Sequence, residues 1–129
     1  MELDNEVIGR WSVADHVVTV EQMPDNHLYT VSVYVQFAED HTPERFWGID
    51  YDVGQACRAL EGKLDAIACV LLALGHYEEK RATRRLCYDL HLFAYNVGRP
   101  LQGMSVPSYV ERKRFEPVEE GAHGDRNDR

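Results

Sequence analysis

The longest periodic stretch of the chain runs from Asp52 to Gly75 and predicts an α-helix. Asp52 can cap the first turn, with Gln55 three residues later as in a capping box, and Gly75 suits the left-handed residue just past a helix end. The apolar residues between them recur at steps of three and four and so share one face: Val53, Ala56, Leu60, Leu64, Ile67, Leu71 and Leu74. The rest of the chain is expected to pack against this face.

A second row on the same predicted helix consists of small residues: Ala59, Gly62, Ala66, Cys69 and Ala73. Such a row lets another backbone approach closely, which would explain Gly62, since glycine inside a helix costs roughly 1 kcal/mol against alanine. From Ala66 to Leu74 the chain is apolar all round, so we expect this half to be buried on more than one side. Two interpretations stay open: a later segment covers the row, or two copies cross there in a homodimer through residues 59–73.

Before this helix, the pattern changes to the alternation of apolar and polar residues that is typical of β-strands. The clearest strand places Tyr34 on the opposite side from its valines. Short connections, including the turn signature Met23 to Asn26, indicate an antiparallel meander. The expected strands are Glu6–Val13, His16–Gln22, Leu28–Phe37 and Arg45–Ile49.

Residues 86–95 fit two periods. Their apolar residues alternate as in a strand, but Leu86, Leu90 and Phe93 also satisfy helical spacing. We favour a fifth strand, with a second helix beginning near Glu78 as the alternative. The predicted fold class is therefore α+β: a four- or five-stranded antiparallel sheet (meander) with one long helix packed on one face.

The 129 residues suit one domain with a modest core, assigned to residues 1–110, and a charged, flexible C-terminal tail over 111–129. No signal-peptide pattern is visible, and the apolar run is too short to span a bilayer, so a cytoplasmic location without membrane contact is expected. The three cysteines include no CxxC pair, which favours reduced, buried thiols over disulfides or a zinc site.

The charge is divided unevenly along the chain. Residues 1–52 contain eleven acidic and two basic residues, whereas residues 53–110 contain five acidic and seven basic ones. An acidic half argues against a nucleic-acid partner and favours a basic protein partner. The leading interpretation is a non-enzymatic, acidic protein-interaction module of the immunity or inhibitor type.

Aromatic and acidic residues indicate where such a partner would bind. If the helix covers one face of the sheet, the other face exposes aromatic side chains beside carboxylates, which is the composition of a recognition surface. The alternative is that the last segment of the chain covers this face. The predicted binding surface consists of Tyr34, Trp47, Asp50 and Tyr51.

Catalytic motifs are not visible. No two histidines have a metal-binding spacing, and no glycine-rich phosphate loop is present, so no cofactor and no metal is expected. The weak candidates for acid–base chemistry are His41, Glu39 and Asp40, which would form a histidine–carboxylate site at the sheet edge of a small enzyme or ligand-binding domain. A solvated loop is the commoner outcome for such a run. The basic run Lys80 to Arg85 can contact phosphates or an acidic surface, or remain solvated.

Short sequence motifs suggest a family. Gly48-Ile49-Asp50, then Leu60-Glu61-Gly62, and later Gly103 to Pro107 resemble a small uncharacterised bacterial domain family, over roughly residues 5–108. The basic segment from Lys80 to Arg85 departs from the family pattern. The resemblance implies a compact α+β fold and carries over no catalytic residue.

Overall fold

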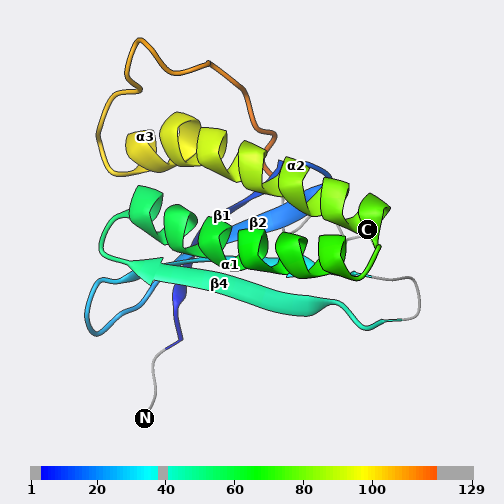
Figure 1. The fold of residues 1–129 in the computed structure, drawn as a ribbon. Helices are drawn as coiled ribbons and strands as arrows, with labels where there is room; N and C mark the ends of the chain where they lie inside the picture. The colour runs from blue at the N-terminus through cyan, green and yellow to red at the C-terminus, as the bar shows by residue number, and fades with distance from the viewer. Residues whose placement is uncertain (1–3, 38–40, 119–129) are drawn as a thin grey trace, which may run out of the picture.

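The computed structural model describes residues 4–37 and 41–118. One antiparallel sheet has the order β1-β2-β3-β4, and Figure 1 shows the two long helices side by side over one of its faces. The strands are β1 (Glu6–Val13), β2 (His16–Gln22), β3 (Tyr29–Val35) and β4 (Glu44–Asp50). The helical segments are α1 (Val53–Ala73), α2 (Tyr77–Phe93), the π-helix η1 (Ala94–Gly98) and the short α3 (Arg99–Leu101). The predicted α+β class and antiparallel meander are confirmed.

Tight local geometry sets the strand register. Ala14 and Asp15 join β1 to β2 with φ angles of 48° and 66°, the left-handed conformation that suits a two-residue hairpin turn. An irregularity between Val7 and Gly9 interrupts the pairing of β1 with β2. It places Val7 opposite Glu21 and leaves it 38% exposed, on the other side of the sheet from Trp11.

Helix α1 begins and ends as its sequence predicts. The Asp52 carboxylate accepts a hydrogen bond from the Gln55 amide at 3.1 Å, and Gly75 has a φ of 83°. The Asp52 amide donates to the Asp50 carboxylate at 3.0 Å, so Asp50 takes the place that a capping box would give to the Gln55 side chain.

Gly48 in β4 brings α1 directly onto the sheet. A Cβ atom at this position would lie 2.0 Å from the Ala56 carbonyl oxygen and 2.8 Å from the Leu60 amide nitrogen. Only glycine permits this backbone contact. The core between the layers is formed by fully buried aliphatic residues: Val13, Val18, Val20, Val31, Val53, Leu60, Leu64, Leu86 and Leu90.

The favoured fifth strand at residues 86–95 is wrong, because this segment continues α2 and enters η1. The helical spacing decides the structure: Leu86, Leu90 and Phe93 are fully buried, whereas Tyr88 is 58% exposed. The alternative of a second helix is the one observed. Two long helices, rather than one, therefore cover the same face of the sheet, as Figure 1 shows.

The segment after residue 110 packs against the domain as far as the structure describes it. Phe115 is 7% exposed, and its ring lies 5.5 Å from that of Phe93. The Ser12 amide donates to the Glu116 carbonyl at 2.8 Å, beside an isolated bridge of Trp11 with Pro117. Residues 111–118 thus border the outer edge of β1, while the rest of the predicted tail lies outside the described residues.

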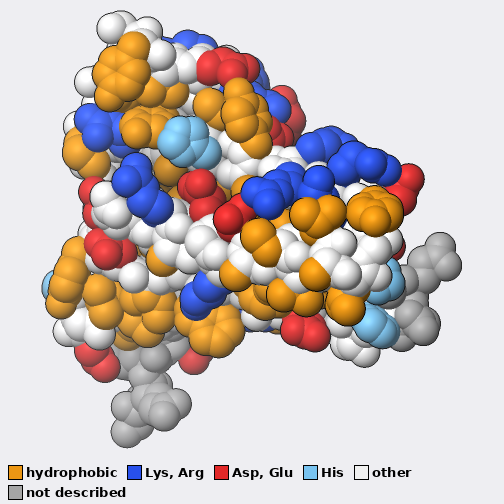
Figure 2. Space-filling model, in the orientation of Figure 1, with side chains coloured by type: hydrophobic (Ala, Val, Ile, Leu, Met, Phe, Trp, Pro, Cys, Tyr) orange, Lys and Arg blue, Asp and Glu red, His pale blue; other side chains and the backbone are white. Residues whose placement is uncertain are grey.

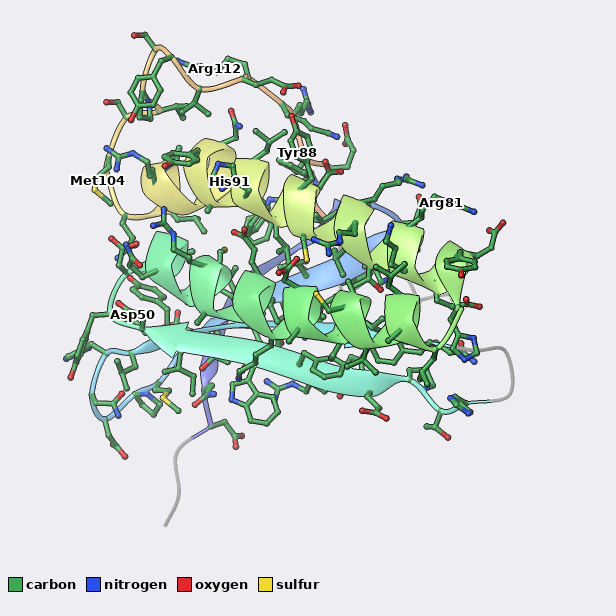
Figure 3. All side chains as sticks on the ribbon, viewed as in Figure 1. Asp50, Arg81, Tyr88, His91, Met104 and Arg112 are labelled. Atoms are coloured by element: carbon green, nitrogen blue, oxygen red, sulfur yellow. The ribbon has the colours of Figure 1, made fainter. Side chains whose placement is uncertain are left out.

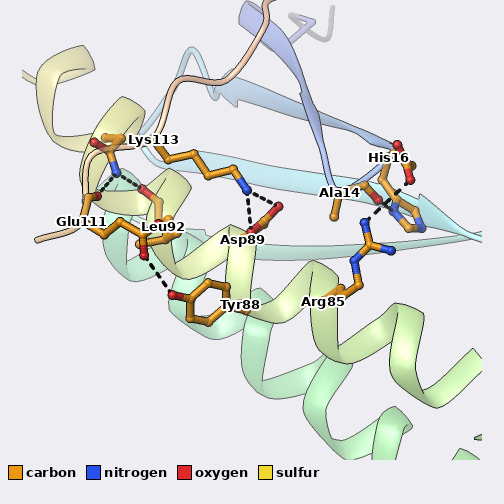
Figure 4. Close-up of polar contacts among 10 residues, drawn as sticks. Ala14, His16, Arg85, Tyr88, Asp89, Leu92, Glu111 and Lys113 are labelled. Atoms are coloured by element: carbon orange, nitrogen blue, oxygen red, sulfur yellow. Dashed lines mark hydrogen bonds and ion pairs between the residues drawn. The ribbon is translucent and has the colours of Figure 1, made fainter.

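Side chains fasten this segment to α2. Lys113 Nζ donates to both carboxylate oxygens of Asp89 at 3.1 Å, and the Tyr88 hydroxyl donates to Glu111 at 3.0 Å (Figure 4). The Glu111 contact raises the pKa of the Tyr88 hydroxyl, because it favours the protonated phenol. These contacts hold the segment across the outside of α2.

Candidate interaction surfaces

The sheet has one face that no described segment covers, here called the open face. Its residues alternate with the core residues along each strand, and the register aligns them across the sheet, as in the row Arg10, Thr19, Ser32 and Trp47. The open face consists of Val7, Arg10, Ser12, Val17, Thr19, Glu21, Thr30, Ser32, Tyr34, Arg45, Trp47 and Ile49.

Large apolar side chains on the open face remain in contact with solvent. Tyr34 is 62% exposed, Val17 46% and Trp47 41%. The Trp47 ring lies between two cations, with the Arg45 guanidinium carbon 5.3 Å and Lys63 Nζ 4.9 Å from its centroid. An exposed aromatic residue whose ring is held by its neighbours is the kind of side chain that anchors protein interfaces.

Thr30 lies on the open face near the start of β3, and its hydroxyl lacks a hydrogen bond within the described chain. Its side chain is flanked by larger neighbours and is only 4% exposed. The Thr30 hydroxyl oxygen has no hydrogen-bond partner among the described residues. A buried polar group without a partner is costly, so this hydroxyl weakens the folded sheet locally.

Strand β4 is the second edge of the sheet, and α1 protects part of it. Lys63 Nζ donates to the Trp47 carbonyl oxygen at 2.5 Å. A lysine at an edge strand hinders pairing with a strand of another chain. The open face, rather than this edge, is therefore the better surface for a partner.

Several acidic residues gather at one end of the sheet, whereas Asp15 and Glu44 lie at the other. The open face carries two arginines, Arg10 and Arg45, and one glutamate, Glu21. The register places Glu6, Glu21 and Asp50 near the strand ends that surround the β2–β3 turn, where Asp25 lies. We call this group, Glu6, Glu21, Asp25 and Asp50, the acidic end.

The four residues of the predicted binding surface divide between these two regions. Tyr34 and Trp47 lie on the open face. Asp50 belongs to the acidic end, and the neighbouring Tyr51 is 66% exposed. The predicted binding surface therefore spans two neighbouring regions, the open face and the acidic end.

The predicted catalytic group cannot be assembled from the described residues. Glu39 and Asp40 lie outside them, and His41 is exposed, with its carbonyl oxygen accepting a hydrogen bond from Gln36 at 2.7 Å. No group of three or more histidine, cysteine, aspartate or glutamate side chains in the described part of the chain is arranged to hold a metal ion.

The small-residue row on α1 is exposed along its whole length: Ala59, Gly62, Ala66, Cys69 and Ala73. Nothing lies within 4 Å of a Cβ atom built on Gly62. The expected burial of the helix from Ala66 to Leu74 is also wrong, since Val70 is 55% and Leu74 66% exposed. Figure 2 shows apolar side chains along this outer side of α1. Helix α2 packs beside the row instead of over it, so no described segment covers it.

The basic run of the sequence lies on the first half of α2, and Figure 2 shows its side chains gathered there. Three of its arginines pair with acids of the same chain. Arg84 contacts Asp65 at 2.6 Å, and Arg81 contacts Glu78 at 3.4 Å. The third pair joins Arg85 to Asp15 at 3.9 Å. Such exposed pairs contribute little stability, but they neutralise much of the patch.

The buried cysteines are not nucleophiles. Burial raises the pKa of the Cys57 thiol, and burial together with Asp65 and Glu61 raises that of Cys87 to about 11. Both therefore remain protonated at neutral pH and have the low reactivity of packing residues. Cys69 is exposed on α1.

Sequence reasoning missed several residues of the open face, including Val17 and Ile49. The alternation of each strand contained the signal, because every residue between two core positions points to the opposite face. It also missed a polar pocket between the two long helices, whose residues come from separate elements.

Comparisons of the chain with protein-family models, with curated proteins and with solved structures find no match. No helix among the described residues has the length and apolar character needed to cross a membrane. The function is therefore argued from the surfaces alone.

Proposed function

We propose that this protein is an interaction module of the immunity or inhibitor type, which binds a basic protein partner across the open face and the acidic end. One observation carries the proposal: Tyr34 and Trp47 remain exposed on the open face, which no described segment covers. Tyrosine and tryptophan are enriched among the residues that anchor the centre of a protein interface.

The charges support a division of roles. The aromatic residues of the open face would supply most of the binding energy, while the acidic end would attract a basic partner and set its orientation. Asp25 is fully available for this role, since it lies exposed in the β2–β3 turn.

Affinity co-purification from the organism that encodes the protein tests the aromatic part. We expect one stoichiometric partner, and at least a tenfold loss of binding for Tyr34→Ser, as is typical when an interface aromatic is truncated. The matched control is Tyr77→Ser, because Tyr77 is 57% exposed on α2, on the opposite layer. Equal recovery of the partner by Tyr34→Ser and the unmodified protein would contradict the proposal.

The charged part has its own test. Recovery of the partner should fall as salt rises, because screening weakens contacts between exposed charges. Asp25→Lys should weaken binding, while Glu78→Lys, an equal change of charge on α2, should not. If both variants bind equally, the partner does not contact the acidic end.

A homodimer through residues 59–73 is a second proposal, supported by the exposure of the whole small-residue row. The open space at Gly62 leaves room for the backbone of a second copy, and the neighbouring Val70 and Leu74 would be covered with it.

Light scattering after size-exclusion chromatography measures this directly. We expect a dimer mass for the unmodified protein and a monomer mass for Gly62→Leu, whose side chain fills the crossing point. The same mass for both proteins would show that this row is not a contact between copies.

A further inference from the structure

A small cavity of about 110 Å³ lies where the first half of α1 faces the junction of α2 with η1. Figure 3 places His91 near the C-terminal end of α2, above the first turns of α1, and Figure 2 shows acidic, basic and histidine side chains together in this region. We call this cavity the helix pocket. Its lining residues are Asp52, Gly54, Gln55, Arg58, Glu61, His91, Ala94, Tyr95 and Arg99.

The helix pocket lies at one end of the contact between α1 and α2. Farther along, α1 and α2 bury Leu64, Ala68 and Leu86. At the pocket, α1 instead presents Arg58 and Glu61, one turn apart on one side of the helix. Arg58 is exposed and Glu61 is half-buried, so both side chains can reach a molecule that enters the pocket.

Arg58 and Glu61 interact electrostatically, but neither side chain is fixed by a hydrogen bond in the described chain. Among the described residues, neither the Arg58 guanidinium, the Glu61 carboxylate nor the Tyr95 hydroxyl makes a hydrogen bond. They line a space with donors and an acceptor still available, which is the pattern of a ligand site.

The opposite wall is held in place by the chain itself. His91 and Tyr95 meet edge to face, with ring centroids 5.3 Å apart. Arg99 Nε donates to the Ser105 carbonyl at 2.8 Å, which fixes the guanidinium. The π-helical turn η1 carries Tyr95 and precedes Arg99, and such turns are rare and occur often at functional sites.

The pocket lining carries two arginines, Arg58 and Arg99, and two carboxylates, Asp52 and Glu61, and the Asp52 carboxylate already accepts a hydrogen bond from the Gln55 amide. Burial raises the pKa of Glu61 to about 7, although Arg58 opposes the rise. Glu61 is therefore partly neutral at physiological pH and does not cancel the two arginines. Guanidinium groups bind carboxylates and phosphates through paired hydrogen bonds, which a lysine cannot match.

We propose that the helix pocket binds a small oxyanion, the carboxylate or phosphate group of a small molecule. The guanidinium groups of Arg58 and Arg99 hold its charge, and the Tyr95 hydroxyl donates a further hydrogen bond. The cavity volume suits a free anion or the anionic group of a larger molecule whose remainder lies outside. This site is independent of the open face, since it lies in the helical layer.

Isothermal titration of the full chain with inorganic phosphate, and separately with malonate, tests the site at constant ionic strength. We expect one of the two to bind at one site with a Kd of about 1 mM or lower, and Arg58→Gln and Arg99→Gln to weaken it about tenfold each. Binding of phosphate alone or of malonate alone assigns the source of the oxyanion.

Two further variants keep the test decisive. Arg81→Gln, an exposed arginine of α2 outside the pocket, should leave binding unchanged. Glu61→Gln should tighten binding at about pH 8, where the native carboxylate is mostly charged and repels the anion. No binding of either anion by the unmodified protein, or equal weakening by Arg81→Gln, would overturn the proposal.

Discussion

The two faces of the sheet have similar β-branched residues and opposite surroundings. Val17 and Val18 are neighbours on β2, yet Val18 is fully buried under the helices and Val17 is 46% exposed on the open face. Residue type alone does not separate them. The difference arises because both long helices pack on the same side of the sheet, so one face stabilises the fold and the other is available for a partner.

The open face is also less fully buried and less fully hydrogen-bonded than the covered face. On the covered face, helices fill the space above every valine. On the open face, Thr30 lacks a hydrogen-bond partner in the described chain, and Tyr34 and Trp47 remain exposed. Association with a partner would bury the exposed aromatic side chains of the open face, whereas the covered face is already buried in the folded chain.

Gly48→Ala is expected to destabilise the packing on the covered face more than any other substitution considered. The added Cβ atom would meet the Ala56 carbonyl at 2.0 Å, so α1 must move away from β4. We expect a loss of about 3 kcal/mol or more in the free energy of unfolding. Urea unfolding measures it, and a loss below about 1 kcal/mol would show that α1 does not depend on this contact.

The paired substitutions Val18→Ala and Val17→Ala test the comparison on one strand. Val18→Ala should cost about 2 kcal/mol of stability, because it removes buried methyl groups and leaves a cavity. Val17→Ala should stay within about 0.5 kcal/mol, as exposed substitutions do. Equal losses in urea unfolding would mean that both faces are covered in solution.

Glu61→Gln tests the raised pKa in the helix pocket. The pKa of Glu61 is raised from 4.5 to about 7 in the folded protein. The protonated carboxyl group therefore stabilises the fold fully below pH 4.5, and this contribution is lost as pH rises through about 7. Relative to the variant, the native protein should lose about 1 kcal/mol across this window, after allowance for solvent screening. Urea unfolding at several pH values measures the difference, and parallel curves would contradict the raised pKa.

The smallest effect is expected for Gly62→Ala on the outer side of α1. No atom lies within 4 Å of the new Cβ, so the better helix propensity of alanine should raise the free energy of unfolding by up to about 1 kcal/mol. Thermal unfolding measures it. This gain is expected for the monomer, and a decrease at concentrations where the chain is a dimer would support the proposed crossing of two copies at Gly62.

The sequence predicted the sheet and α1 well because each signal is local. Valine-rich alternation marks the strands, and Asp52 and Gly75 mark the ends of α1. The segment after α1 was predicted wrongly because its leucines fit both periods: Leu86 and Leu90 follow the helical spacing, and Leu92, two residues from Leu90, is also buried. Only the packing of this segment against α1 and β1 decides between a strand and a helix.

The surfaces were predictable only in part. Tyr34 was assigned to the outer face by alternation, but the position of the acids at the sheet end depends on strand register, which the sequence leaves open. The helix pocket could not be predicted. Arg58 and His91 come from helices far apart in sequence, and their meeting required α2 to be a helix on the same face as α1.

The central claim is that the open face contacts a protein partner, and site-specific photo-crosslinking in the native organism tests it most directly. A photoreactive amino acid in place of Tyr34 should crosslink to one basic protein, while the same group in place of Tyr77 on α2 should not. A crosslink from position 77 and none from position 34 would place the partner on the helical layer and contradict the account.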